Sequence, residues 1–102
     1  MNRLVRDGMV AVLISPGFGA GWSTWNTEYP DIVFDPGIVE LVEQKKSQEL
    51  ETYVTLKYPG VYQGGLSELR VHWIPQGAEF IIDEYDGAES LKLKDDILWY
   101  RA

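Results

Sequence analysis

The sequence contains no cysteine, which excludes disulfide bonds, thiolate metal sites and a cysteine nucleophile. Basic residues are also scarce: 9 Lys and Arg stand against 16 Asp and Glu, giving a net charge of −7. Direct nucleic-acid binding is therefore disfavoured, because phosphate backbones need a basic footprint. No apolar run approaches the roughly 18 residues that span a bilayer. The first run is short and ends at Pro16, so we expect neither a membrane segment nor a signal peptide.

A length of 102 residues with 45% apolar residues predicts one folded domain over residues 1–102. The acidic balance has two interpretations. It can simply keep the protein soluble, or it can dock the protein onto a basic partner.

The local patterns predict both strands and helices. Residues 9–15 form a continuous apolar run with β-branched members, which is typical of a buried strand. Ile32–Phe34 is expected to be a short extended piece. Asp35 followed by Pro36 predicts a helix start, because Asp35 can accept from free N–H groups and proline suits the first helical position. A second helix is expected to be capped by Ser47 and to end at residues 58–60.

The remaining residues predict antiparallel strands. Leu69, Val71 and Trp73 alternate with polar neighbours, and residues 79–85 form another strand pattern. Asp86-Gly87 is a strong hairpin signal, with Leu91 on the returning strand. A last apolar segment covers residues 97–100. Because helices and strands are segregated, the predicted class is α+β: an N-terminal strand, a glycine-rich loop, two short helices and a C-terminal antiparallel β-meander.

The loop after the first strand carries the strongest functional signal. It places glycines at alternate positions and then two tryptophans. Glycine lets backbone N–H groups approach a ligand, and tryptophan offers an apolar face for stacking. The candidate ligand-binding residues here are Gly17, Phe18, Gly19, Gly21, Trp22, Trp25 and Asn26. The Walker A and dinucleotide-binding spacings are absent. The alternative is a tight loop whose tryptophans fill the protein's own core.

Two further candidates come from the first strand after the helices. Arg70 and His72 should share the face opposite Val71 and Trp73, forming a small positive spot for an anion. A small hydrolase that uses His72 with nearby carboxylates is a further hypothesis, but no nucleophile–base motif is visible. The acidic residues at 79–96, Glu89 among them, lack calcium-loop spacing and are expected to form a solvated face. No metal or cofactor is therefore predicted.

A second loop, residues 58–65, is also rich in aromatic residues and glycine. It is expected to meet the first loop in space and form a cleft with it. The surplus of aromatic residues also leaves a homodimer open.

Two stretches carry a family resemblance: RDGMVAVLISPGFGAGWSTWN, residues 6–26, and WIPQGAEFIIDEYDGAESL, residues 73–91. From about Arg6 to near the C-terminus, the chain resembles a group of short proteins encoded by tailed phages and prophages. No activity is assigned to that group, so no catalytic residue carries over. The resemblance implies an accessory protein in the cytoplasm of a bacterial host, and by analogy a role against host defence.

The leading prediction is a non-enzymatic protein that sequesters a small anionic, nucleotide-like ligand through the Gly/Trp loop. The alternative is an acidic inhibitor that docks on a basic host protein. A small hydrolase ranks third.

Overall fold

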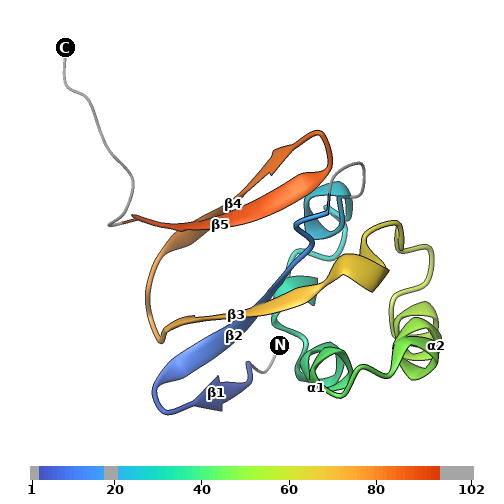
Figure 1. Cartoon of the computed structure of the whole chain (residues 1–102), viewed down its shortest axis with the longest axis horizontal. Helices are drawn as coiled ribbons and strands as arrows, with labels where there is room; N and C mark the ends of the chain where they lie inside the picture. The colour runs from blue at the N-terminus through green and yellow to red at the C-terminus, as the bar shows by residue number, and fades with distance from the viewer. Residues whose placement is uncertain (1–2, 18–20, 95–102) are drawn as a thin grey trace.

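The computed structural model describes residues 3–17 and 21–94, and its element order is drawn in Figure 1. The N-terminal hairpin joins β1 (Val5–Arg6) to β2 (Met9–Ile14). Asp7 and Gly8 form its turn, with φ of 51° and 77°. Positive φ at both central residues gives the tight turn whose twist matches the flanking strands.

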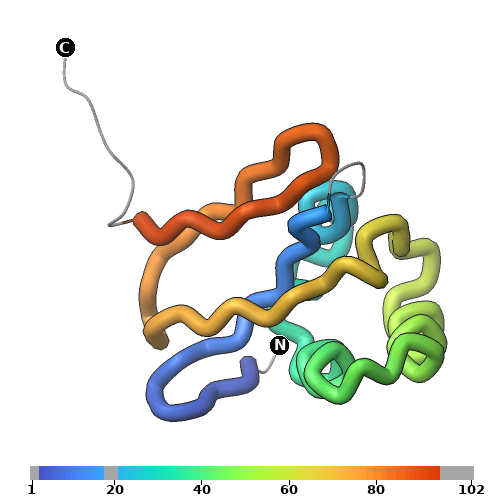
Figure 2. The backbone as a smooth tube through the Cα atoms, viewed as in Figure 1, coloured from blue at the N-terminus to red at the C-terminus, as the bar shows by residue number. Residues whose placement is uncertain are grey.

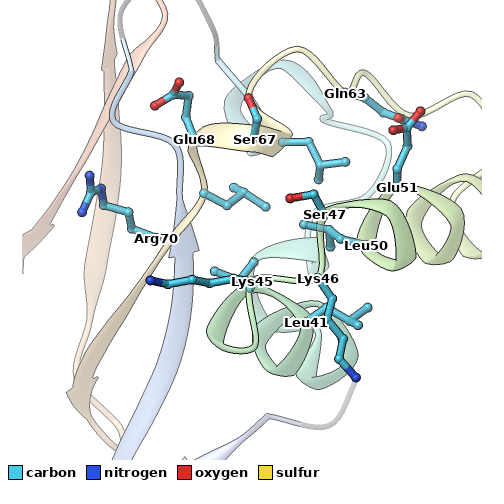
Figure 3. Close-up of a pocket in the computed structure, with 13 residues that line it drawn as sticks. Leu41, Lys45, Lys46, Ser47, Leu50, Glu51, Gln63, Ser67, Glu68 and Arg70 are labelled. Carbon is cyan, nitrogen blue, oxygen red and sulfur yellow. The ribbon is translucent and has the colours of Figure 1, made fainter.

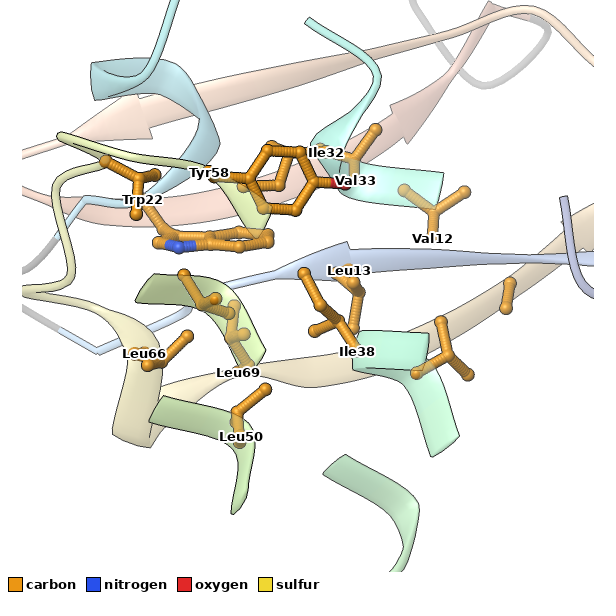
Figure 4. Packing of buried hydrophobic residues seen from close by; sticks show 14 of the residues in the cluster. Val12, Leu13, Trp22, Ile32, Val33, Ile38, Leu50, Tyr58, Leu66 and Leu69 are labelled. Atoms are coloured by element: carbon orange, nitrogen blue, oxygen red, sulfur yellow. The ribbon is translucent and has the colours of Figure 1, made fainter. Parts of the chain in front are cut away.

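β2 is the central strand of a three-stranded antiparallel sheet ordered β1-β2-β3. β3 (Arg70–Pro75) pairs along β2 with Val12 opposite His72 and Ile14 opposite Arg70. The predicted buried strand is confirmed, since residues 10–14 of β2 are all buried. Figure 4 shows Val12 and Leu13 pointing to opposite sides of β2, so apolar side chains pack on both faces of this strand.

The approach to the first helix differs from the prediction. Ile32–Phe34 is the 3₁₀ helix η2, not an extended piece. The N–H groups of Phe34 and Asp35 each donate to a carbonyl three residues earlier. This tighter path buries Ile32 and Val33; local propensity gave no sign of it.

The predicted helix start at Asp35-Pro36 is confirmed. In α1 (Pro36–Glu43), Asp35 Oδ1 accepts hydrogen bonds from the N–H groups of Gly37 at 2.8 Å and Ile38 at 3.2 Å. Proline at the first position loses no helical hydrogen bond. Ile38 and Val39 then face the core.

The link between the helices is a Schellman turn. Lys45 N–H donates to Val42 O and Lys46 N–H donates to Leu41 O, with Lys45 at φ 57°. α2 (Ser47–Lys57) therefore has Lys46 at its N-cap, and Ser47 is a helical residue that supplies no side-chain cap. The predicted Ser47 cap is wrong by one position because the turn ends one residue earlier and α2 begins at Ser47 itself. The helix end before Tyr58-Pro59 is confirmed.

The last described elements are β4 (Phe80–Tyr85) and β5 (Ala88–Leu93), a separate antiparallel pair. Asp86 and Gly87 form the predicted turn, with φ of 52° and 87°. The α+β class is confirmed. Within the described residues, the C-terminal antiparallel pairing is between β4 and β5, whereas β3 pairs with β2. The segment predicted at residues 97–100 lies outside the described residues.

The backbone trace in Figure 2 shows the β4–β5 hairpin on one side of the three-stranded sheet and the two α-helices on the other. Between β2 and β3 the chain also forms η1 (Ser23–Trp25) and η3 (Leu66–Glu68). Figure 4 places Trp22 and Ile32 on the Val12 side of β2, and Ile38 and Leu69 on the Leu13 side. These buried side chains belong to a single hydrophobic cluster.

Candidate functional site

The glycine-rich loop is organised by a carboxylate from the hairpin. Glu89 of β5 is 2% exposed. Its Oε1 accepts from Ser15 N–H at 2.9 Å, and its Oε2 accepts from the N–H groups of Trp22 and Thr24, both at 3.0 Å. Thr24 Oγ1 also donates to Oε2, at 2.7 Å. Glu89 N–H in turn donates to Ser15 O at 2.8 Å.

Glu89 corrects the expectation that the acidic residues at 79–96 form only a solvated face. It occupies donors of the segment predicted to hold an anionic ligand. A signal for this was present: Leu91 and Leu93 alternate inward on β5, and the same period places Glu89 on the inward face. The loop thus does gather N–H groups around an anion, but that anion is part of the protein.

Trp22 and Trp25 have different environments. Trp22 is 0% exposed and belongs to the core, so the expected stacking of Trp22 on a ligand is wrong. Its Nε1 is buried and has no hydrogen-bond partner among the described residues. Trp25 is 45% exposed, and its Nε1–H donates to Glu84 Oε1 at 2.8 Å. Gly21 permits this position of the Trp25 ring, since a Cβ at residue 21 would lie 2.7 Å from Trp25 Cε2. Phe18 and Gly19 lie outside the described residues.

Asn26 joins the two aromatic loops, whose predicted meeting is confirmed. Its side chain is buried, and Nδ2 donates to Trp22 O at 2.8 Å and to Tyr62 O at 2.9 Å. Tyr62 N–H donates to Asn26 Oδ1 at 2.7 Å. These bonds satisfy the buried amide internally, so Asn26 positions the loops and presents no free donor to a ligand. The rings of Trp25 and Tyr62 are 5.1 Å apart and tilted by 46°.

Arg70 and His72 share the exposed side of β3, as predicted, while Val71 and Trp73 are partly buried. The His72 imidazole makes no hydrogen bond or ion pair within residues 3–17 and 21–94. Without a carboxylate to orient it or a hydroxyl to activate, it lacks the contacts of a catalytic base. Gly17 lies against the neighbouring 3₁₀ helix, where a Cβ would be 2.9 Å from Glu68 Cγ.

A cavity of about 530 Å³ lies between the α1–α2 turn and the η3–β3 segment. Figure 3 shows leucine side chains at its centre and the nitrogens of Lys45 and Arg70 extending toward the same side. Within the described part of the chain, Lys45, Lys46 and Arg70 form no ion pair. The residues that line the cavity are Leu41, Val42, Lys45, Lys46, Ser47, Leu50, Glu51, Gln63, Leu66, Ser67, Glu68, Leu69 and Arg70.

Sequence reasoning identified only Arg70 of this lining as a ligand-binding residue. Lys45 and Lys46 lie just after the C-terminal end of α1, where the helix dipole favours cations, so their position has a local explanation without a ligand. The turn itself is local, but its place beside η3 depends on packing between elements distant in sequence.

A second polar cluster surrounds Asp35. Lys57 Nζ lies 2.8 Å from Asp35 Oδ2, Tyr53 OH donates to Oδ1 at 2.9 Å, and Tyr58 OH donates to Oδ2. Burial opposes the charged carboxylate, but hydrogen bonds from Lys57, Tyr58, Tyr53 and the Ile38 N–H outweigh it and lower the pKa of Asp35.

The same contacts determine the other protonation states. The hydrogen bond with Asp35 is the main cause of the raised pKa of Lys57. Burial, followed by the hydrogen bond to Asp35, raises the pKa of Tyr58. A nucleophilic lysine or a tyrosinate base needs the opposite shift. The cluster therefore caps α1 and ties it to α2.

Residues 3–17 and 21–94 contain no group of three or more His, Asp or Glu side chains placed to hold a metal ion. None of their helices combines the length and apolarity needed to cross a bilayer.

Comparison of the chain with protein-family models, curated proteins and solved structures finds no match in any of the three.

Proposed function

We propose that this protein is a non-enzymatic binding protein that captures a small anion bearing an apolar or ring-shaped group. The observation that carries the proposal is the cavity between the α1–α2 turn and η3–β3. Its volume of about 530 Å³ is in the range of small-molecule sites. Its leucine floor suits an apolar group, and Lys45 and Arg70 suit an anionic one.

The charge of the whole chain makes this cavity distinctive. At a net charge of −7, most of the surface repels an anion, yet three cations that form no ion pair with residues 3–17 or 21–94 line this cavity. Glu51 and Glu68 also line it, so a ligand with fewer negative charges is favoured over a polyphosphate.

The ligand of this proposal is the one predicted from sequence, and its place in the molecule is different. Glu89 already occupies the amides of Ser15, Trp22 and Thr24, so the Gly/Trp loop offers fewer free donors than its composition suggests. Arg70 is the predicted residue that lines the cavity. In the phage setting that the resemblance implies, the protein would remove a small host signal from solution.

Isothermal titration calorimetry tests the proposal with mono-, di- and cyclic nucleotides, octanoate, octanol and inorganic phosphate. We expect the ring-bearing or apolar anions to bind more tightly than phosphate or octanol alone. Removing one cation, in Arg70→Ala or Lys45→Ala, should weaken binding about five- to tenfold. Lys92→Ala is the matched control, because Lys92 is a cation paired with Asp83 on the hairpin. Absence of binding by every anion, or equal weakening by Lys92→Ala, would overturn the proposal.

A further inference from the structure

The exposed ring pair Trp25–Tyr62 forms a second recognition surface with Glu84, which we call the aromatic corner. Trp25 is 45% exposed and Tyr62 is 38% exposed, although the two rings are in contact with each other. The two ring planes are tilted by 46°, so the rings are not stacked face to face. Exposed aromatic side chains of this kind are the commonest anchors of protein interfaces.

The aromatic corner is held in place before any partner arrives. The bond from Trp25 Nε1–H to Glu84 Oε1 fixes the indole, and the buried Asn26 side chain fixes the backbone of Tyr62. Figure 1 shows η1 beside the tip of the β4–β5 hairpin, which brings Trp25 to Glu84. A fixed surface loses little conformational entropy on binding.

Its electrostatics favour a cation. Aromatic faces carry negative potential, and Glu84 adds a carboxylate whose Oε2 makes no hydrogen bond within the described residues. Neither Glu84 nor the neighbouring Asp86 has an ion-pair partner in the same part of the chain. Internal cations cover other rings, with Arg3 on Phe34 and Arg6 on Trp73, whereas among described residues none covers Trp25 or Tyr62.

We propose that the aromatic corner binds an arginine side chain of a basic partner protein. A planar guanidinium can stack flat on the indole while its N–H groups donate to Glu84 Oε2, whereas the compact ammonium of lysine has no plane that stacks on the ring. The net charge of −7 attracts a basic segment from a distance. This inference does not depend on the cavity at Lys45 and Arg70, whose charge is opposite.

NMR titration with a blocked hexapeptide of alternating arginine and glycine tests the inference. The Trp25 indole N–H signal should shift on addition of this peptide. The counterpart in which citrulline, a neutral analogue, replaces arginine should produce no shift, and the lysine counterpart should bind more weakly. Affinity for the arginine peptide should fall as salt rises.

Variants separate the aromatic corner from the general acidic charge. Trp25→Ala should weaken arginine-peptide binding about five- to tenfold. Glu84→Gln keeps an acceptor for the indole N–H while removing the charge, and should weaken binding several-fold in a protein that stays folded. Tyr85→Ala is the matched control, since Tyr85 is an aromatic residue of the same hairpin that is 79% exposed. The inference is overturned if the citrulline peptide binds as well as the arginine peptide. It is also overturned if Tyr85→Ala weakens arginine-peptide binding as much as Trp25→Ala does.

Discussion

Replacement of Glu89 by alanine should be among the most destabilising changes in this protein. The carboxylate accepts four hydrogen bonds while 2% exposed, and its removal leaves the N–H groups of Ser15 and Trp22 without their acceptor. Hydrogen bonds to a charged group contribute about 1.5–3 kcal/mol each, but bonds to one carboxylate are not additive. Because water can partly replace the acceptor, we expect Glu89→Ala to lower the free energy of unfolding by about 3–5 kcal/mol.

That loss is a large part of the total stability. A domain of this size unfolds with about 5–15 kcal/mol, and each kcal/mol shifts its melting temperature by about 4–8 °C. Urea unfolding and differential scanning calorimetry of Glu89→Ala against the unmodified protein measure the effect. Glu79→Ala is the matched control: Glu79 pairs with Lys94, its side chain is 70% exposed, and its loss should cost under about 1 kcal/mol.

The same variant allows a chemical rescue. Alanine at position 89 removes one methylene and the carboxylate, which together correspond to acetate. If the loop amides form an anion cradle, acetate should restore part of the lost melting temperature of Glu89→Ala more than chloride at equal ionic strength, and should not affect Glu79→Ala. Equal stability of the two variants, or equal rescue by both salts, would refute the reasoning.

Three further predictions concern other parts of the molecule. Because the pKa of Asp35 is lowered, its contribution to the free energy of unfolding is fully present above its ordinary pKa of 3.8 and is lost as pH falls from there through the lowered pKa. Asp35→Asn should remove this acid dependence in urea titrations between about pH 2 and pH 6. Lys45→Gly should raise the free energy of unfolding by about 0.5–1 kcal/mol, since glycine adopts φ 57° without strain, while calorimetry should show weaker anion binding. Trp22→Phe breaks no side-chain hydrogen bond within the described residues, so urea unfolding should report only the destabilisation from a smaller ring, about 1–3 kcal/mol.

The elements that could be predicted from sequence are those fixed by neighbouring residues. Asp35-Pro36 set the start of α1 and Asp86-Gly87 set the hairpin, because capping and positive φ are properties of a few consecutive residues. The pairing of β3 with β2 joins segments about sixty residues apart, and no local pattern distinguishes it from pairing with β4. The prediction of an extended piece at Ile32–Phe34 was wrong for the same reason, because burial of this 3₁₀ helix depends on the core around it.

The candidate sites also contain features set by neighbouring residues and features set by contacts between distant segments. Composition pointed to a loop that gathers N–H groups around an anion, and the loop does so; which anion it holds is decided by the register of β5, which places Glu89 inward. The cavity at Lys45 required both the Schellman turn and the position of η3, and the aromatic corner required Asn26 to join two loops. Each depends on contacts between distant segments.

The buried carboxylates show which charges remain for recognition. Asp35 and Glu89 are fully supplied with donors from the chain itself, so a ligand gains nothing from them. Recognition then depends on charges that have no ion-pair partner in the described residues, among them the positive Lys45 and Arg70 and the negative Glu84.

Opposite signs make the two proposals separable in one experiment. Arg70→Ala should weaken anion binding and leave the arginine peptide unaffected, and Trp25→Ala should do the reverse. If each variant impaired both ligands, the cavity and the aromatic corner would be parts of a single interface. The charge argument that assigns them to different partners would then fail.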